Sequence, residues 1–434
     1  MERTGKVVGR QAAVARRLIE FVDAYARRVY PAVLEQHDAG AVCSPLGVWL
    51  LLAACASAAE GDDRRALERS LGCPADQAAE SLAAFMAAPP PALQAAMALW
   101  VRAADARQEV REWARGLPPA LQTGLMPTQE EADAWARRTT DGLIERFPMR
   151  IDERTRIVLA SALATKVSWS VPLEVVAAAE HLGQSSPWQG QVNRLLWDER
   201  PGLIGKLVHT RAAGLVAVHC AAAVEGVTVV SVSAEPGLSR ALVLDAAHEV
   251  VALMRDRWPA SIGCSLFDLP LGSGHSWQIS EREIPTWTAG EQVELITGAS
   301  LPAWRVEGQL DLKRSELFGS AAALNVLRDL IGPRPDDETE AGQAAVASFT
   351  RFGFEAAAIT FFGVATSLQA EPPEIGVERS ATLRFDHPYA AVAIAGTASA
   401  AAGDEQPDSS FTGLPLFTAW IDTPEEPEDD PEDD

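Results

Sequence analysis

Cysteine is scarce in this 434-residue sequence, and its five copies follow no recognisable spacing. An odd number of cysteines without a C-x-x-C pair fits neither a dense disulfide framework nor a zinc site, so we expect reduced thiols. The histidines also lack the H-x-x-H and H-E-x-x-H spacings of metal sites, and no G-x-G-x-x-G or G-x-x-x-x-G-K-[ST] loop occurs. The sequence therefore gives no support for a metal ion or any other cofactor.

Basic residues are too few to favour a polyanionic partner. The sequence has 37 lysines and arginines against 60 acidic residues, a formal net charge of -23. This balance argues against nucleic acid or an anionic membrane as the main partner. Eight of the acidic residues lie in residues 425–434, which we expect to form a solvated, disordered acidic tail.

A long apolar segment is also missing. Arg16 and Arg17 interrupt the N-terminal region before an apolar run can form, so neither a signal peptide nor a membrane span is indicated. We expect a cytoplasmic monomer. Secretion stays open for a chain from which a leader had been removed.

The composition that remains is that of a folded protein, with 47% hydrophobic and 22% charged residues. Helical spacing covers residues 12–36, and Ser44 with Pro45 reads as the N-cap and first turn of a second helix. Further helices are predicted at 63–71, 130–147 and 250–257, and strands at 157–164, 214–220, 227–232, 241–244 and 277–283. Helices first and strands later predict an α+β fold, and the absence of a linker or repeat predicts one domain over residues 12–424.

Residues 353–360 read Gly-Phe-Glu-Ala-Ala-Ala-Ile-Thr, a run of mostly small side chains. Glycine tolerates backbone angles that other residues resist, and alanine enters a packed sheet without needing much volume. On its own such a run is equally typical of a buried strand or helix in an alanine-rich protein. Other parts of the chain are needed to interpret it.

Six ordered segments resemble the serpin family. They are Cys43-Ser44-Pro45-Leu46; Trp135 with Thr140 and Gly142; Lys166-Val167-Ser168-Trp169; Leu301-Pro302 with Leu310; Phe385-Asp386-His387-Pro388-Tyr389; and Leu414-Pro415-Leu416-Phe417. This resemblance implies three β-sheets, eight to nine helices and an exposed reactive-centre loop. It makes residues 353–360 the hinge of that loop.

The resemblance also implies a protease inhibitor that acts as a suicide substrate and not an enzyme. Family spacing from Gly353 places the cut near Ser367, and the predicted scissile residues are Thr366, Ser367 and Leu368. No Arg or Lys lies there, so the implied target is a subtilisin-, elastase- or chymotrypsin-like serine protease. The hinge residues are Gly353, Phe354, Glu355, Ala356, Ala357, Ala358 and Thr360.

Strand periodicity divides the hinge into two faces. Phe354, Ala356, Ala358 and Thr360 share an uncharged face that can be buried, and Glu355 falls on the opposite face. The resemblance further implies a sheet-opening region, assigned to Ser44, Ser161, Trp169 and Gln343.

A second reading is a non-inhibitory binding or scaffold protein with the same fold. Phe354 stands where inhibitory members usually have Thr or Ser, and Arg351 replaces an acidic residue. Gly40, Gly47, Ser161 and Gln343 occupy places where the family usually has Asn, Ser, Asn and His. Residues 375–383 are an extra stretch before the closing strands.

An enzyme built on His219 and Cys220 is not favoured. Neighbouring strand residues point to opposite faces, so this pair cannot act as a base and a nucleophile. We expect Cys220 in the core and His219 at the surface. For His387, within the closing-strand motif, we expect a structural role.

Overall fold

The computed structural model describes residues 2–169, 171–199, 205–255, 263–354, 374–396 and 411–428, with side chains from Arg10 onward. Its first part is mainly helical, as predicted. The α-helices in these ranges are α1 (Glu2–Leu34), α2 (Pro45–Ala56), α3 (Gly61–Leu71), α4 (Ala75–Ala87), α5 (Gln108–Gly116), α6 (Gln129–Thr139), α7 (Ala178–His181), α8 (Arg240–Arg255) and α9 (Ser320–Ile331). None of them is long and apolar enough to cross a bilayer.

Helix α2 is the central helix of the N-terminal half. It is apolar on all sides and buried along nearly its whole length, which matches its position between other helices and the sheets. The predicted start is confirmed, because Ser44 Oγ accepts the Gly47 N–H at 3.3 Å and Pro45 lies in the first turn. The helix therefore presents a fixed N-terminus to the strands beside it.

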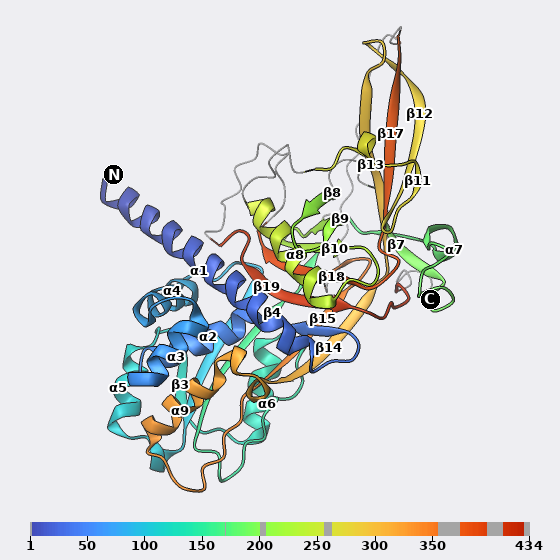
Figure 1. The fold of residues 1–434 in the computed structure, drawn as a ribbon. Helices are drawn as coiled ribbons and strands as arrows, with labels where there is room; N and C mark the ends of the chain where they lie inside the picture. The colour runs from blue at the N-terminus through green and yellow to red at the C-terminus, as the bar shows by residue number, and fades with distance from the viewer. Residues whose placement is uncertain are drawn as a thin grey trace.

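A six-stranded sheet forms the apolar centre of the molecule (Figure 1). All residues of its strands β10, β18 and β19 are buried, since α8 packs on this sheet and other elements cover the opposite face. In sheet order the strands are β1 (Ala41–Cys43), β19 (Pro415–Ile421), β18 (Tyr389–Ala395), β10 (Val227–Ser233), β9 (Gly214–Ala222) and β8 (Gly205–Thr210).

A second six-stranded sheet projects from the body as a long arm (Figure 1). In sheet order it contains β11 (Gly272–Ser273), β12 (Trp277–Thr286), β17 (Glu374–Arg384), β13 (Gln292–Leu301), β7 (Arg194–Asp198) and β6 (Glu174–Ala177). Strand β17 lies between β12, with which it pairs antiparallel, and β13, with which it pairs parallel. The extra stretch at residues 375–383 is thus the middle strand of the arm.

The remaining strands form a sheet in two separate pieces. One piece is β3 (Gln122–Leu125), β2 (Leu93–Val101) and β4 (Ile157–Thr165), and the other is β14 (Trp304–Asp311) with β15 (Gly342–Phe349). The short strands β5 (Val167–Ser168) and β16 (Gly353–Phe354) pair with each other close by. Within the described residues no ladder joins β4 to β15.

Two local predictions are wrong. Residues 241–244 are part of α8 and not a strand, because a short apolar run is ambiguous and here the helical spacing continues to Arg255. The helix predicted to end at residue 147 ends at Thr139, where Asp141 and Gly142 adopt left-handed backbone angles (φ 52° and 82°).

The acidic C-terminal segment begins as an ordered part of the body. The Glu425 N–H donates to Ala303 O at 2.7 Å, and Glu426 Oε1 accepts the Asn193 N–H at 2.6 Å. The Glu426 carboxylate also lies 3.6 Å from Arg194 Nε. The expectation of a solvated tail from residue 425 is therefore wrong for its first residues. A β-bridge to Ala303 holds Glu425, and Arg194 pairs with Glu426. Residues 429–434 lie outside the described residues.

Candidate functional site: a slot in the divided sheet

The gap between β4 and β15 contains a cavity of about 1160 Å³. Each of these strands has a ladder on its outer side, to β2 and to β14, and none toward the other among the described residues. The two facing edges therefore present backbone N–H and C=O groups across the cavity, the arrangement that accepts an added strand. We call this gap the slot.

The walls of the slot carry small, uncharged side chains along most of its length. From β4 they include Ala160, Ala162 and Ala164, and from β15 they include Ala344 and Ala345. Charged groups gather at its lower end, where Arg156, Asp105, Arg334 and Asp337 lie. An extended chain with small side chains fits these walls, because alanine leaves room for a neighbouring strand without demanding repacking.

A hydrogen-bonded cluster beneath the slot ties both of its edges to the start of α2. From β15, Gln343 Nε2 donates to Ser44 O and Gln343 Oε1 accepts the Ser44 N–H, both at 2.9 Å. From β4, Ser161 Oγ donates to Gly47 O at 3.0 Å. The structure thus brings together three residues assigned to the sheet-opening region. The amide of Gln343 bonds the helix directly, and an ideal Cβ on Gly47 would lie 3.4 Å from Gln343 Nε2 and from Ser161 Oγ.

Trp169, the fourth assigned residue, lies at the other end of the slot. Its ring is 5.0 Å from that of Phe349, and its Nε1 donates to Thr350 O at 3.0 Å. Its backbone N–H donates to Phe352 O at 2.9 Å. The upper end is therefore closed by an aromatic cluster and by hydrogen bonds to the segment that leads into the predicted hinge.

Phe354 is buried at this upper end, with 5% of its surface exposed. Its ring lies 6.4 Å from that of Trp304 in an edge-to-face arrangement, and Trp304 stacks on Phe349 at 6.0 Å. Edge-to-face contacts of this kind are favourable. Phe354, which stands where inhibitory members usually have Thr or Ser, thus has a defined apolar site at the position where β16 begins the hinge.

Gly353 is required by close backbone approach. In the β16–β5 ladder it is opposite Ser168, and a Cβ on Gly353 would collide with the Val167 carbonyl. Its backbone angle is not in the left-handed region. The sequence suggested that Gly353 is needed for its backbone freedom. In this conformation it is needed because it lacks a side chain.

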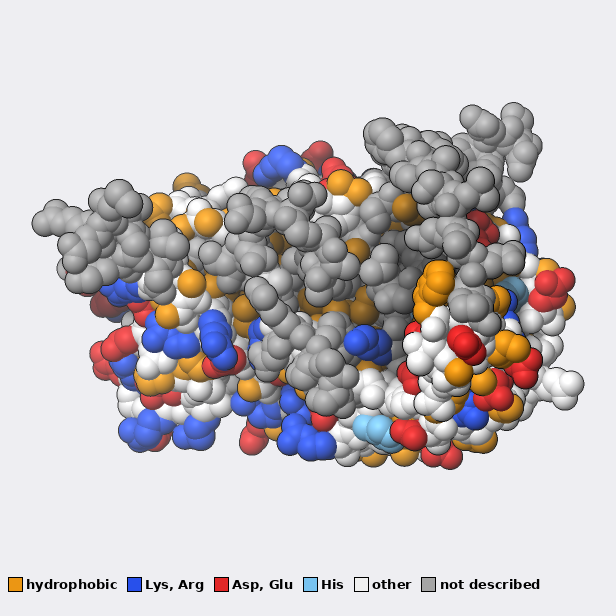
Figure 2. All heavy atoms as spheres, turned by 90° about the horizontal axis from the view of Figure 1, so that it is seen from above, with side chains coloured by type: hydrophobic (Ala, Val, Ile, Leu, Met, Phe, Trp, Pro, Cys, Tyr) orange, Lys and Arg blue, Asp and Glu red, His pale blue; other side chains and the backbone are white. Residues whose placement is uncertain are grey.

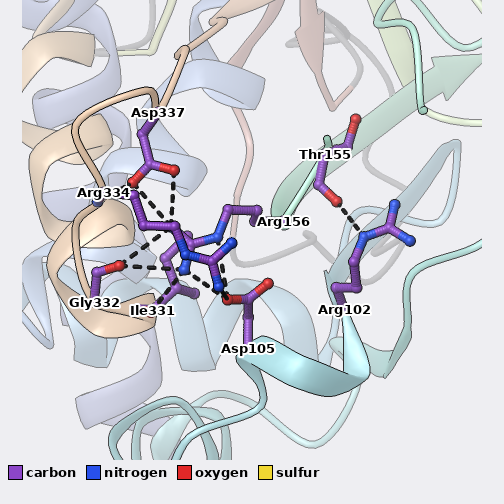
Figure 3. Close-up of polar contacts among 8 residues, drawn as sticks. All are labelled: Arg102, Asp105, Thr155, Arg156, Ile331, Gly332, Arg334 and Asp337. Atoms are coloured by element: carbon purple, nitrogen blue, oxygen red, sulfur yellow. Dashed lines mark hydrogen bonds and ion pairs between the residues drawn. The ribbon is translucent and has the colours of Figure 1, made fainter. Parts of the chain in front are cut away.

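The lower end of the slot is closed by Arg156, the residue before β4 (Figure 3). Its guanidinium lies 2.6 Å from Asp105 and 2.8 Å from Asp337, and it also donates to the carbonyls of Ile331 and Gly332. Asp105 lies in a short 3-10 helix (Ala103–Asp105) that follows β2, whereas Ile331 ends α9 and Gly332 and Asp337 lie in the connection from α9 to β15. One side chain, 9% exposed, therefore joins the two pieces of the sheet. We call Arg156, Asp105 and Asp337 the latch.

The charges of the latch support each other. Burial alone would raise the pKa of Asp337, but the Arg334 backbone N–H and the Arg156 guanidinium outweigh it and hold this pKa below its usual value. The hydrogen bond with Asp105 raises the pKa of Arg156 further. Arg334 adds a second cation, 3.0 Å from Asp105. Arg156 and Asp337 are therefore both charged near neutral pH.

The latch cannot be predicted from the sequence. Its only signal there is an arginine directly before an apolar run, and that pattern does not identify partners 51 and 181 residues away. The other predicted hinge residues (Glu355, Ala356, Ala357, Ala358 and Thr360) and the predicted scissile residues (Thr366, Ser367 and Leu368) lie outside the described residues.

The expectation that His219 lies at the surface is wrong, because His219 is fully buried with its Nε2 3.1 Å from Asp198 Oδ2. Cys220 is partly buried and packs against the main core, close to what was expected. Alternation along a strand identifies an inner and an outer face only when one face is solvated, and β9 is covered on both sides. Burial raises the pKa of Cys43 and Cys55 to about 12, so neither thiol is an active nucleophile at neutral pH. No group of three or more His, Cys, Asp or Glu side chains in the described ranges could hold a metal ion.

Comparison with known proteins finds similarity to serpins in sequence pattern and in fold. The family model described as "Serpin (serine protease inhibitor)" matches residues 21–180. No curated protein is significantly similar in sequence. Among solved structures, Serpin48 of the insect Tenebrio molitor is 16% identical with a TM-score of 0.57, covering 94% of this chain and 98% of its own. The native thermophilic serpin tengpin is 13% identical with a TM-score of 0.61, covering 94% of each chain.

Human thyroxine-binding globulin in complex with its ligand is 12% identical with a TM-score of 0.59, covering 96% of this chain and 99% of its own. At such identities these likenesses establish the fold, an α+β serpin fold. The resemblance to the serpin family is confirmed over residues 21–180, which the family model matches. That model is described as one of serine protease inhibitors.

Proposed function

We propose that this protein inhibits a serine protease as a suicide substrate, with residues 355–373 as the bait and the slot as the acceptor. The observation that carries the proposal is the pair of facing edges of β4 and β15, which lack a ladder to each other among the described residues. A strand entering the slot would hydrogen-bond both edges and bury apolar surface, and that gain would drive the change after cleavage.

The chain length agrees with this function. A cut after Ser367 would release the thirteen residues 355–367, and β4 contains nine residues. At roughly 3.3 Å per residue the released segment is long enough to run along the whole of β4. The predicted inward residues Ala356 and Ala358 are uncharged and small, as the alanine-lined walls require.

The target we propose is a subtilisin-, elastase- or chymotrypsin-like protease, because the residues around the predicted cut are small or aliphatic. The test is incubation of the protein with each of these proteases. We expect a complex that survives boiling in SDS, cleavage within Thr366–Leu368, and a large rise in the melting temperature of the cleaved protein. Cleavage without such a complex and without the rise in melting temperature would overturn the proposal.

A matched pair of variants tests the slot as the acceptor. Ala356→Glu places a charge on the face predicted to be buried, and Ala357→Glu places the same charge on the opposite face. We expect the first variant to be cut without forming a stable complex and the second to remain an inhibitor. Equal behaviour of the two would show that strand insertion is not the basis of inhibition.

A second candidate is a binding module that does not inhibit. The thyroxine complex of one structural relative shows that this fold also carries a small ligand. The observation that favours this reading is Phe354, which is already buried against Trp304 and so holds the start of the hinge in place. If the protein is a binding module of this kind, a protease will cut the loop without being held in a stable complex.

A further inference from the structure

The arm ends in exposed apolar side chains that are not packed into the core of the protein. Trp287, in the turn between β12 and β13, is 65% exposed, and Ile375 near the start of β17 is 63% exposed. Pro285 is opposite Ile375 in the β12–β17 ladder and is also exposed. Among the exposed large apolar side chains of the described residues, Trp287 is the one aromatic. We call Pro285, Trp287 and Ile375 the arm tip.

Contacts below the tip already hold the arm together. Glu281 and Arg379 form a cross-strand ion pair at 2.8 Å, and Arg282 and Glu378 form another at 2.6 Å. The turn itself is fixed by the Gly290 N–H, which donates to Ile375 O at 2.9 Å. The apolar tip side chains are therefore not needed to order the arm, and large exposed apolar residues gathered at one point indicate a contact with another molecule.

The position of the tip in the chain identifies its partner. Strand β17 begins at the tip, with Glu374 opposite Thr286, and runs down into the body. The predicted scissile residue Leu368 precedes Glu374 by six residues, which span at most about 20 Å. The start of the loop, at Phe354, is fourteen residues from Leu368. A protease bound at the cut is thus tethered to the tip by the shorter segment.

The size of a protease–inhibitor interface brings the tip within reach of a protease bound at the cut. Such interfaces cover about 800 Å² on each partner, a patch about 16 Å in radius. The six residues from Leu368 to Glu374 span about 20 Å only when fully extended, so a patch centred on the scissile bond covers the start of β17 whenever this segment spans about 16 Å or less. On the right of Figure 2, where the arm points toward the viewer, hydrophobic and acidic side chains lie side by side, a surface that is exposed to such a partner.

We propose that the arm tip is an accessory docking surface for the same protease that cleaves the loop. This inference rests on the proposed function. Trp287 supplies a rigid aromatic contact of the kind that dominates binding energy at interfaces, and Ile375 extends it. The extra strand length of β12 and β17 serves to carry this surface out to where the protease binds.

The test is the second-order rate constant for loop cleavage, measured with subtilisin, elastase and chymotrypsin, using whichever protease cuts the wild-type protein fastest. We expect Trp287→Ala to lower it by about tenfold, and Ile375→Thr, which keeps a β-branched residue in the strand, to lower it by several-fold. Because Trp287 is not part of the loop, its effect cannot come from altered loop sequence. Unchanged melting temperatures would show that the variants are folded.

The matched control is Leu125→Ala, which removes a side chain of similar exposure (67%) from β3, far from the arm in Figure 1. We expect its rate constant to equal that of the wild type. Equal rate constants for Trp287→Ala and the wild type would overturn the inference while leaving the proposed inhibition intact.

The same assay can also support docking at the arm tip while refuting inhibition. Cleavage that depends on Trp287 but yields no SDS-stable complex would support the docking surface and refute inhibition. A loop that none of the three proteases cuts within Thr366–Leu368 would refute both.

Discussion

At the scale of single residues, Arg156 is the side chain whose contribution to stability can be argued most directly from its contacts. Its side chain is 9% exposed and makes charged or polar contacts with Asp105, Asp337 and two carbonyl groups. Loss of the Arg156 guanidinium would leave the Asp337 carboxylate without this partner and Asp105 with Arg334 as its remaining cation. Removing one partner of a buried ion pair costs more than the pair itself contributes. The latch is therefore sensitive to loss of the guanidinium in a way that a surface ion pair is not.

We expect Arg156→Ala to lower the free energy of unfolding by about 3–5 kcal/mol. Arg156→Lys recovers only part of this, since an ammonium group cannot reproduce the forked contacts of a guanidinium. The measurement is urea denaturation at neutral pH. The control is Arg154→Ala, two residues away, where the side chain is 81% exposed and its ion pair measures 3.8 Å. If both alanine variants lose equal stability, the latch does not hold the sheet together.

The latch also predicts a pH dependence. The pKa of Asp337 is lowered in the folded protein, so its carboxylate adds stability above the unfolded pKa of about 3.9, and this stability is lost as the pH falls through the folded pKa. Asp337→Asn should therefore be less stable than the wild type at neutral pH, and the difference should shrink below about pH 4. The measurement is the denaturation midpoint as a function of pH.

The control for that experiment is Asp336→Asn, which removes the same charge from an exposed neighbour without touching Arg156. A gap between the Asp337→Asn variant and the wild type that stays constant down to pH 2 would contradict the assigned role of the carboxylate.

At the scale of secondary-structure elements, the sequence predicts those whose signals are local. The Ser44-Pro45 cap, the helix predicted at residues 12–36 (α1, Glu2–Leu34) and the strand predicted at 157–164 are all identifiable from neighbouring residues. The pairing of β17 with β12 was not, because its register joins residues about 100 positions apart, such as Arg282 and Glu378. The projecting arm also lacks the regular apolar alternation that marks a strand with one buried face.

The same distinction applies to the slot. Ser44, Ser161 and Gln343 could be assigned through the family resemblance, since family motifs supply long-range neighbours that spacing alone does not. Gln343 stands where the family usually has His, and its side-chain amide hydrogen-bonds both the N–H and the C=O of Ser44. That reciprocal bond depends on a side-chain geometry that the sequence does not contain.

Gly353 gives a prediction at this scale, because it determines whether β16 can pair with β5. Gly353→Ala places a methyl group against the Val167 carbonyl, and overpacking of this kind costs on the order of 1–3 kcal/mol. We expect the Gly353→Ala variant to have a lower melting temperature. We also expect more inhibitor molecules to be cut for each protease molecule that is held in a stable complex. Gly116→Ala is the control, since no atom lies within 4 Å of the added methyl group and alanine suits the last residue of α5. Equal melting temperatures for the two variants would show that close approach at Gly353 is unimportant.

At the scale of the whole molecule, the slot, the latch and the arm divide the work of one mechanism. The latch and the α2 cluster hold both pieces of the sheet, between which the described residues form no strand ladder, and β17 is fixed in the arm by its pairing with β12. Under the proposed mechanism, a cut near Ser367 would free residues 355–367 from the arm. Insertion into the slot would then require cleavage, which would couple the energy of insertion to the cut.

The net charge of -23 gives the last prediction, since it acts over the distance between the free protein and an approaching protease. Residues 277–301 and 374–384, which include the three long strands of the arm, contain six acidic and three basic side chains, so the field is negative where the loop joins the arm. The Debye length falls from about 30 Å at 0.01 M salt to about 8 Å at 0.15 M. We expect the rate constant for loop cleavage by a positively charged protease to fall steeply over this range.

A protease of the same specificity but with net negative charge should show no fall, or a rise, under the same conditions. Cleavage of a free peptide of residues 360–373 controls for direct effects of salt on each protease. If both proteases respond to salt alike after this correction, the charge of the protein does not steer its encounter with the target, and the acidic surface of the arm contributes only to solubility.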